Sequence, residues 1–446
     1  MGIFKAYDIR GIYPEEIDAD KANRIAKAIV TFLNADTIVV GRDNRLSSEE
    51  LFEAAVKGVT ELGVNVIDIG VVSSPMSYFA VNHLKGKGLV CVTASHNPKQ
   101  YNGFKVTREE AKPVSYESGL QEMEKIYNGN QFKQFSNKTG SIRKEDVTEA
   151  YLRHLSEFVK GVAGLKVVVD CGNGVMGPIV DAMFSKLFIE YIPMYFERDG
   201  NYPNHEPNPM KEENLKGLQK RARETNANLG IAFDGDGDRV VFVDEKGITV
   251  PADFVTALIA MSILKPEDIA LYDLRSSWVV KETIEAMKAK AEMSKVGHSL
   301  IKEHMRRVNA VFAGELSGHY YFKDNYYADC GMIAALMVMG LVSKKGKMSE
   351  IIKPLKKYFK IPEKNYEVED KDAVLERVEK EYAGKDGFKI FKLDGISVET
   401  DKFWLNVRKS NTEPIIRLNA EAKSNALLQK VVQDAERLIT QQSQSL

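Results

Sequence analysis

Apolar runs and amphipathic stretches alternate along most of the chain. Thr37-Ile38-Val39-Val40 is a β-branched run that predicts a buried strand. A stretch with helical periodicity follows from Ser48 to Leu62, with Ser47 or Ser48 as its N-cap. Alternation of strands and helices is typical of α/β proteins with parallel or mixed sheets. We therefore expect an α/β fold for the greater part of the chain.

One phrase of this pattern occurs three times. A buried strand runs into a polar turn, and an amphipathic helix follows, at 38–45, 166–174 and 269–277. Farther along, a second apolar strand ends in a glycine-containing polar loop at 88–98, 228–239 and 310–319. In α/β sheets, ligands collect at the carboxyl ends of strands. The repeat therefore predicts three related mixed-sheet α/β domains that each present a loop at the end of an equivalent strand. The alternative is that any α/β chain repeats strand, turn and helix.

The pattern changes after about Tyr358. A charged helix is expected from Asp370 to Tyr382, and short strands around 394–400 and 403–422. These elements favour a separate α+β domain at the C-terminus. The expected domains are residues 1–145, 146–246, 247–360 and 361–446.

Composition narrows the class of protein. The 446 residues are 44% hydrophobic and 28% charged, as in globular proteins, and the net charge of -1 argues against nucleic-acid and membrane-surface partners. Cys91, Cys171 and Cys330 have no paired ligand spacing, which excludes a zinc ribbon and a disulfide framework. No signal peptide is visible, and the apolar stretch 333–342 is too short to span a bilayer. We expect a cytoplasmic protein, either a monomer or a homodimer.

Three carboxylates alternate with glycines in Asp234-Gly235-Asp236-Gly237-Asp238-Arg239. Such a loop can converge on one hard cation, which also relieves the repulsion among its like charges. An EF-hand needs glycine where Arg239 stands and a helix where 240–243 predicts a strand. A few carboxylates plus a phosphate oxygen favour Mg²⁺, so we predict a magnesium site here. A solvated acidic turn is the alternative.

A serine stands at the end of another apolar strand, in Thr93-Ala94-Ser95-His96-Asn97-Pro98. A side chain at this position projects into a site, but the glycines of a hydrolase nucleophile elbow are missing. From the motif alone, catalysis and an ordinary Asn-Pro turn are equally favoured. Lys105 offers a phosphate contact, or is a solvated lysine.

Two further groups carry candidate chemistry. Glu315, Ser317 and His319 alternate, so an extended loop points all three one way, toward sugar hydroxyls or toward solvent. His319 is also a candidate general acid or base. A cluster of phosphate-binding donors is formed by Arg408, Ser410, Asn411 and Thr412. Near the N-terminus, Arg10 adds a guanidinium, unless it only pairs with Asp8.

Six ordered motifs together resemble the α-D-phosphohexomutase family, and most closely its phosphomannomutase/phosphoglucomutase branch. They are YDIRG (7–11), GRDNR (41–45), TASHNP (93–98), DGDGDR (234–239), GELSGH (314–319) and RKSNTEP (408–414). This resemblance extends from end to end and implies four domains around one cleft. It implies that Ser95 carries a phosphoryl group, and that Mg²⁺ is held by the phosphoserine with Asp234, Asp236 and Asp238.

The resemblance also assigns the other residues. Glu315 and Ser317 match sugar contacts, and the non-reacting phosphate would be bound by Arg408, Ser410, Asn411 and Thr412. Positions that line the family's active site are held by Tyr7, Arg10, His96, Lys105, Arg239, His298 and His319. Among these, Arg10 and Lys105 are expected to stabilise charge, and His319 to carry a proton. Arg275 is also expected to line the site, at a position where many members have lysine.

The reaction implied is the interconversion of hexose 1-phosphate and hexose 6-phosphate, of mannose or glucose, through a hexose 1,6-bisphosphate that also serves as activator. Leu316 in the sugar loop does not decide the substrate, so a phosphoglucosamine mutase stays open as an alternative. A mutase or phosphatase whose phosphoryl acceptor is Asp234 or Asp236 also stays open, as does a non-catalytic sugar-phosphate sensor.

Overall fold

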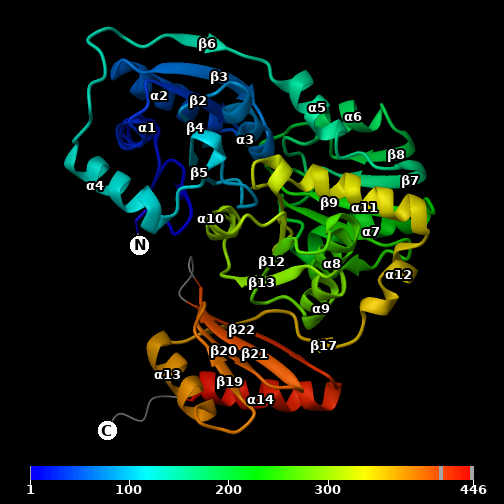
Figure 1. Cartoon of the computed structure of the whole chain (residues 1–446). Coiled ribbons are helices and arrows are strands. Elements are labelled where there is room, and N and C mark those ends of the chain that lie inside the picture. Colours follow the sequence, from blue (N-terminus) through cyan, green and yellow to red (C-terminus); the bar gives the residue numbers. More distant parts are fainter. Residues whose placement is uncertain (1, 411–414, 442–446) are drawn as a thin grey trace.

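The computed structural model describes residues 2–410 and 415–441, which contain four β-sheets in succession along the chain. The first three sheets lie together with helices around them, and the fourth lies apart at the C-terminal end (Figure 1). The predicted class, three mixed-sheet α/β domains and a C-terminal α+β domain, is confirmed.

The first sheet has the strand order β1-β5-β4-β2-β3-β6. Its strands are β1 (Ile9–Ile12), β2 (Thr37–Arg42), β3 (Asn65–Val71), β4 (Gly88–Val92), β5 (Tyr101–Arg108) and β6 (Ile142–Lys144). Its helices are α1 (Ala19–Leu33), α2 (Ser48–Glu61), α3 (Ser74–His83) and α4 (Gln121–Gly129). α2 is the helix predicted from Ser48, and Ser47 is its N-cap.

The second sheet has the order β11-β10-β9-β7-β8. Its strands are β7 (Ala163–Asp170), β8 (Phe188–Met194), β9 (Leu229–Phe233), β10 (Val240–Val243) and β11 (Thr249–Val250). Its helices are α5 (Thr148–Ser156), α6 (Gly177–Phe184) and α7 (Glu212–Glu224). The strand predicted at 240–243 is confirmed as β10. β11 pairs with β10, so this sheet continues beyond residue 246, the predicted end of the second domain. The limits of the four domains remain a prediction.

The third sheet has the order β13-β12-β14-β15-β16. Its strands are β12 (Ile269–Asp273), β13 (Lys290–Ser294), β14 (Phe312–Gly314), β15 (Tyr320–Phe322) and β16 (Ala328–Asp329). Its helices are α8 (Ala252–Ile263), α9 (Trp278–Ala286), α10 (His298–Val308), α11 (Gly331–Lys345) and α12 (Met348–Ile351). Buried side chains of α11 join those of β7 and α8 in one continuous apolar core, so the second and third domains pack as a unit. None of the described helices is both long and apolar enough to cross a bilayer.

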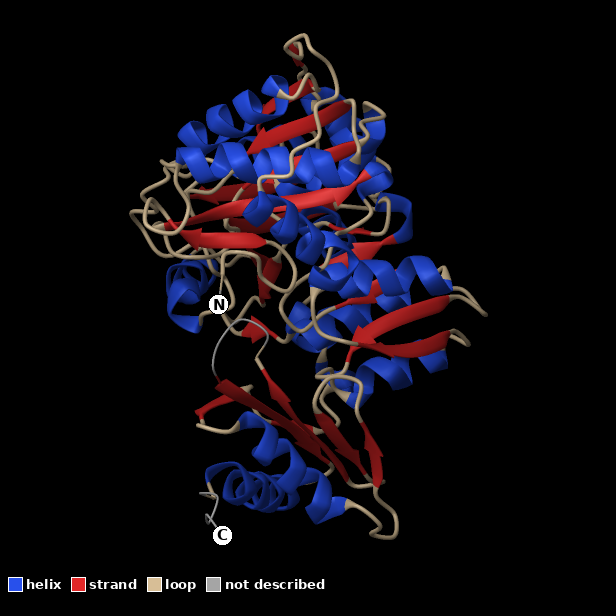
Figure 2. Ribbon diagram, turned by 90° about the vertical axis from the view of Figure 1, so that its left-hand side faces the viewer, coloured by secondary structure: helices blue, strands red, loops and turns tan. Residues whose placement is uncertain are grey.

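The fourth sheet is antiparallel, with the order β17-β22-β21-β20-β19 and β18 paired to β22. Its strands are β17 (Phe359–Lys360), β18 (Lys364–Glu367), β19 (Lys389–Phe391), β20 (Ile396–Glu399), β21 (Phe403–Lys409) and β22 (Ile415–Ala422). Its helices, α13 (Lys371–Tyr382) and α14 (Asn425–Thr440), lie on one side of the sheet (Figure 2). The charged helix predicted from Asp370 begins one residue later because Asp370 caps it.

The first three sheets contain the same four-strand arrangement, which is the predicted repeat. Three strands run parallel and the fourth is antiparallel, in the orders β3-β2-β4-β5, β8-β7-β9-β10 and β13-β12-β14-β15. The equivalent third strands are β4, β9 and β14, and each runs directly into one of the polar loops singled out in the sequence. Because parallel strands deliver the following loops to one edge of a sheet, each domain presents its loop at the same place.

Candidate active site

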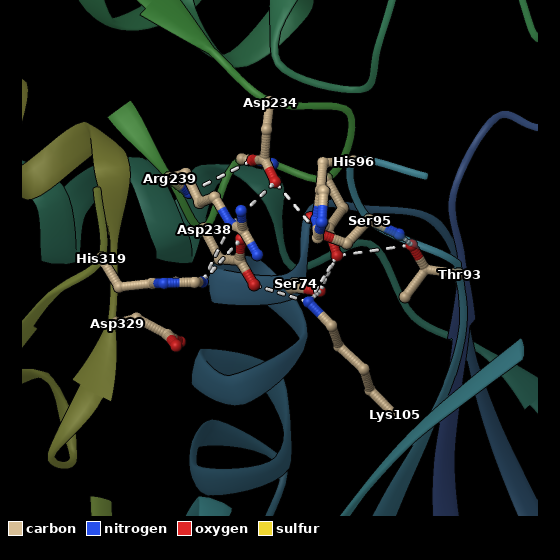
Figure 3. A network of polar contacts seen from close by, with 12 residues as sticks. Ser74, Thr93, Ser95, His96, Lys105, Asp234, Asp238, Arg239, His319 and Asp329 are labelled. Carbon is tan, nitrogen blue, oxygen red and sulfur yellow. Dashed lines mark hydrogen bonds and ion pairs between the residues drawn. The ribbon is translucent and has the colours of Figure 1, made fainter. Parts of the chain in front are cut away.

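The three loops meet in a cavity of about 590 Å³ that residues of all four domains line. Ser95 lines it from the first domain, Asp238 from the second, Glu315 from the third and Arg417 from the fourth. In the close view of Figure 3, Ser95, Asp234, Asp238, Lys105 and His319 point toward one another. Asp234 and Asp238 share the loop after β9, and Lys105 lies on β5. The structure therefore brings together side chains that are far apart in the sequence.

Ser95 follows β4 and is almost fully buried. Its backbone has a φ of 52°, the left-handed region that a non-glycine residue adopts at a cost. Its Oγ donates a hydrogen bond to Oδ2 of Asp234 over 3.0 Å and lies 3.1 Å from Nδ1 of His96. The backbone amide of Ser95 donates to Oγ1 of Thr93 over 2.9 Å. The hydroxyl is thus fixed beside the acidic loop.

Arg45 fixes the loop that carries Ser95. Its guanidinium donates to the backbone carbonyls of Ser95, Asn97, Pro98 and Tyr101, at 2.7 to 3.1 Å. Asp43, also fully buried, accepts from Nε of Arg45 at 3.1 Å and compensates its charge. Both residues belong to the GRDNR motif, so this motif serves the serine loop.

Asp234, Asp236 and Asp238 are fully buried on the loop after β9. One carboxylate oxygen from each lies within 4.8 Å of the others. Burial, and then the charges of Asp238 and Asp236, raise the pKa of Asp234 well above its ordinary value. Backbone amides of Gly237 and Arg239 donate to Oδ1 of Asp234 at 2.9 and 3.1 Å and fix its orientation. Three buried carboxylates at this spacing need positive charge to stay ionised.

Lys105 supplies part of that charge. Its ammonium lies 2.6 Å from Oδ2 of both Asp236 and Asp238, and 3.1 Å from Oγ of Ser74. Burial disfavours the charged amine, but the two carboxylates outweigh it and raise the pKa of Lys105 well above its ordinary value. Burial likewise opposes ionisation of Asp238, yet Lys105 and His319 hold the pKa of Asp238 well below its usual range. Lys105 is therefore a buried counterion of the acidic loop.

The acidic loop also fits a metal ion. Oδ1 of Asp236 is buried and accepts no hydrogen bond from any described residue, so one ligand atom remains to be satisfied. Hard divalent cations prefer carboxylate oxygens, and this loop offers three of them close together. Asp234, Asp236 and Asp238 can thus bind a metal at the point where Ser95 Oγ lies.

On the third domain, Glu315, Ser317 and His319 line the cavity. The loop is a turn, closed by a hydrogen bond from the Gly318 amide to the Glu315 carbonyl, and is not the extended segment that the alternation assumed. His319 lies 3.4 Å from Oδ1 of Asp238 and 3.3 Å from Oε2 of Glu315, and its Nδ1 is 2.9 Å from Oγ of Ser317. Burial lowers the pKa of His319, but these carboxylates prevail and raise it to about 9. Nε of Arg239 lies 3.3 Å from Nε2 of His319. The sugar loop and the acidic loop therefore share one network.

The remaining candidates of the first and third domains also line the cavity. Arg10 binds Asp8, its alternative role, and in addition donates to Oδ1 of Asn97 over 2.7 Å beside the serine. Burial, then the charges of Arg239 and Arg10, lower the pKa of His96, which keeps it neutral. Tyr7 donates its hydroxyl to the carbonyl of Val296 over 2.9 Å. His298, at the start of α10, is also kept neutral because burial, then Lys302, lowers its pKa.

In the fourth domain the structure adds an arginine to the predicted set. Arg408 is only 2% exposed and does not line the cavity, whereas Arg417 does. Ser410 is buried and donates its amide to the carbonyl of Ile415 over 2.9 Å. Asn411 and Thr412 lie outside the described residues. Arg417 was missed because no motif marks it; its signal is that it faces Arg408 across the β21–β22 hairpin.

Arg275 also faces the cavity, from the turn after β12. It binds Oδ2 of Asp273 at 2.9 Å and Oε1 of Glu315 at 3.4 Å. The sequence predicted that Arg275 lies near the site but indicated no partner for it. In the structure Arg275 forms an ion pair with Glu315 of the sugar loop.

Comparisons with known proteins agree with this architecture. The chain matches the four domains of the phosphoglucomutase/phosphomannomutase family in order. They are described as alpha/beta/alpha domain I (residues 1–134), II (149–247) and III (251–358) and the C-terminal domain (363–438).

Full-length relatives agree as well. A phosphomannomutase of Salmonella montevideo is 38% identical, over 95% of this chain and 95% of the relative. A phosphomannomutase/phosphoglucomutase of Pseudomonas syringae is 37% identical, over 96% and 93%. The crystal structure of a phosphoglucomutase/phosphomannomutase family protein from Burkholderia thailandensis superimposes with a TM-score of 0.90 at 33% identity, covering 98% of this chain and 96% of that one. The chain therefore belongs to the phosphoglucomutase/phosphomannomutase family and is a phosphohexose mutase.

Proposed function

We propose that this mutase interconverts the 1-phosphates and 6-phosphates of mannose and glucose, with Ser95 as the residue that carries the phosphoryl group. One observation carries the proposal. The buried hydroxyl of Ser95 lies 3.0 Å from Asp234 of the three-carboxylate loop, in one cavity with the sugar loop and Arg417. Phosphoryl transfer depends on positioning and charge neutralisation, and this cavity supports both.

The reaction proposed has two balanced transfers. In the first, the Oγ–P bond of phosphorylated Ser95 breaks as a P–O bond forms to O6 of a hexose 1-phosphate, and the proton of the O6 hydroxyl ends on Oγ of Ser95. The 1,6-bisphosphate then turns within the cavity. In the second, the bond between O1 and phosphorus breaks as a P–O bond forms to Oγ of Ser95, and the Ser95 proton ends on O1, which releases hexose 6-phosphate. Glu315 and Ser317 would bind the sugar in both orientations through adjacent hydroxyls.

Protons are moved by histidines in this proposal. Neutral His96, with Nδ1 3.1 Å from Ser95 Oγ, is suited to accept the serine proton. His319, whose pKa is raised to about 9, carries a proton at neutral pH and is suited to donate one. Arg10 and Lys105 stabilise the charge of the transferred group.

The metal in this proposal is Mg²⁺, held by Asp234, Asp236, Asp238 and the phosphoserine. Bound there, it would neutralise charge on the phosphoryl oxygens. The hexose 1,6-bisphosphate is the activator that restores phosphorylated Ser95. Arg408, Arg417 and Ser410, together with Asn411 and Thr412, are proposed to bind the phosphate that does not react.

The cellular setting is also part of the proposal. Cys91, Cys171 and Cys330 are all buried and unpaired, which is compatible with a reducing cytoplasm. The partner is a phosphosugar, and the chain works as a monomer or homodimer.

Phosphosite mapping by mass spectrometry after incubation with glucose 1,6-bisphosphate tests the nucleophile. We expect acid-stable phosphate on Ser95; an acyl phosphate on Asp234 or Asp236 would refute the serine mechanism. Assays with the 1-phosphates of mannose, glucose and glucosamine test the substrate. A clear preference for the amino sugar would show that the protein is a phosphoglucosamine mutase. Binding of these sugars without turnover would show that it is a sensor.

A further inference from the structure

Glu363 forms ion pairs with three arginine side chains at the boundary between the third and fourth domains. It lies between β17 and β18, where the chain enters the C-terminal sheet. Its carboxylate lies 3.2 Å from Arg408, 3.2 Å from Arg417 and 3.6 Å from Arg275, and accepts from Nδ2 of Asn419 over 2.9 Å.

The first reason that this carboxylate matters is the register of the hairpin. Arg408 on β21 and Arg417 on β22 are direct cross-strand partners, so their side chains leave the same face of the sheet. Like charges directly opposite each other destabilise a sheet. Arg408 is also 2% exposed, and a buried guanidinium needs a counterion. Glu363 compensates both charges of the hairpin, because its Oε2 pairs with Arg408 and its Oε1 with Arg417.

The second reason is the connection to the third domain. Arg275 binds Asp273 at 2.9 Å and Glu315 of the sugar loop at 3.4 Å, and it reaches Glu363 at 3.6 Å. A single carboxylate therefore joins the arginines of the fourth domain to the arginine that holds the sugar loop. Burial opposes ionisation of Glu363, but Arg275 and Arg408 outweigh it and lower the pKa of Glu363 to about 2. The carboxylate is charged at neutral pH.

Glu363 itself is not among the described residues that line the cavity, whereas Arg417 and Arg275 are. Its influence on a ligand must therefore pass through these arginines. We propose that Glu363 is a positioning residue. It orients the guanidinium of Arg417 toward the cavity, and through Arg275 it fixes the position of the β21–β22 hairpin relative to the sugar loop. This inference rests on the proposed function, since it assumes that the fourth domain binds the substrate phosphate.

The test replaces Glu363 with glutamine, which keeps its size and removes its charge. The phosphate that does not react is bound equally in the ground state and in the transition state. A weaker contact with this phosphate therefore raises KM and leaves kcat nearly unchanged. We expect KM for glucose 1-phosphate to rise about tenfold with kcat within about threefold, because a hydrogen bond to a charged group contributes on that scale. Glu363→Asp, which keeps the charge, should recover part of the loss.

Glu367→Gln is the matched control. Glu367 ends β18, the strand that begins directly after Glu363, and is exposed, so the KM of this variant should equal that of the unaltered enzyme. Thermal unfolding of each variant shows whether a KM change comes with a loss of folded protein. An unchanged or lower KM in folded Glu363→Gln would overturn the proposal.

Binding measured without turnover separates this proposal from the proposed function. In a Ser95→Ala background, calorimetry with glucose 6-phosphate should show about tenfold weaker binding for Glu363→Gln and for Arg417→Gln, and little further weakening when both are combined. Additive losses would show that Glu363 does not act through Arg417. If the unaltered enzyme binds glucose 6-phosphate but places no phosphate on Ser95, the proposed mechanism fails while the role of Glu363 stands.

Discussion

The hydroxyl oxygen of Ser95 lies 3.0 Å from Oδ2 of Asp234, although 139 positions separate the two residues in the chain. The serine belongs to the first domain and the aspartate to the second. Their contact places the group that is proposed to carry phosphate at the loop that can bind a metal. The proposed catalytic centre therefore lies between the first and second domains.

Removal of the Ser95 hydroxyl should abolish turnover. In Ser95→Ala no oxygen remains to carry the phosphoryl group, so we expect kcat to fall by at least about 10³-fold, the scale seen when a nucleophile is removed. A coupled assay that follows glucose 6-phosphate formation measures this. Ser185→Ala, at the C-cap of α6, is the control and should keep full activity. Full turnover by Ser95→Ala would rule out the serine mechanism.

Removal of the metal should stop the reaction, and Mg²⁺ should restore it. Asp236 contributes a buried oxygen that no described residue satisfies. Asp236→Asn should therefore weaken Mg²⁺ binding by at least about tenfold, measured by calorimetric titration of chelator-treated protein. Asp401→Asn changes an exposed carboxylate and should bind Mg²⁺ normally. Equal affinities of Asp236→Asn and the unaltered protein would place the metal elsewhere.

Arg45→Gln should impair both stability and turnover. It removes a buried guanidinium from four carbonyls of the serine loop and leaves Asp43 without its partner. Breaking a buried pair costs about 3–5 kcal/mol of unfolding free energy. A displaced nucleophile lowers kcat by about 10²-fold. Urea unfolding and steady-state kinetics measure the two effects.

The control for Arg45 is a neighbouring arginine. Arg42 pairs with the exposed Glu49, so Arg42→Gln should cost at most about 1 kcal/mol and leave kcat intact. Wild-type kcat in folded Arg45→Gln would show that the loop holds its shape without the guanidinium.

The stability of metal-free protein should fall as the pH rises from about 6.5 to about 9. Burial lowers the pKa of His319 and Asp238 raises it, to a net value of about 9 from the ordinary 6.5. Because the folded state binds the proton more tightly, this stabilisation is fully present below the unfolded pKa and is lost as the pH passes the folded one.

Urea unfolding of the metal-free protein and of His319→Gln, at several values from about pH 6 to about pH 10, checks this. The stability difference between the two should shrink as the pH rises. A difference that does not change with pH would contradict a protonated His319.

Much of the fold could be predicted from the chain alone because it is locally encoded. The period of apolar positions predicted the strand at 240–243 and the helix from Ser48, and the three similar phrases predicted three similar sheets. Short-range motifs marked the loops after β4, β9 and β14 for the same reason, since each is contiguous in sequence.

Other features depend on pairings that no local pattern contains. Nothing near Arg45 predicts that it binds carbonyls of the serine loop, and nothing near Glu363 indicates three arginines. Arg417 is among the described residues that line the cavity, and only the register of the hairpin shows that its side chain leaves the same face of the sheet as that of Arg408.

The sequence by itself determined the elements, the order of the domains, the family and the identity of the reactive loops, because hydrophobic periodicity and short motifs act over a few neighbouring residues. Only the tertiary structure decided which loop touches which. The contact of Ser95 with Asp234, the shared lysine Lys105 and the arginine cluster on Glu363 arise where separate domains pack, and those distances are set by the sheets and the interfaces between them.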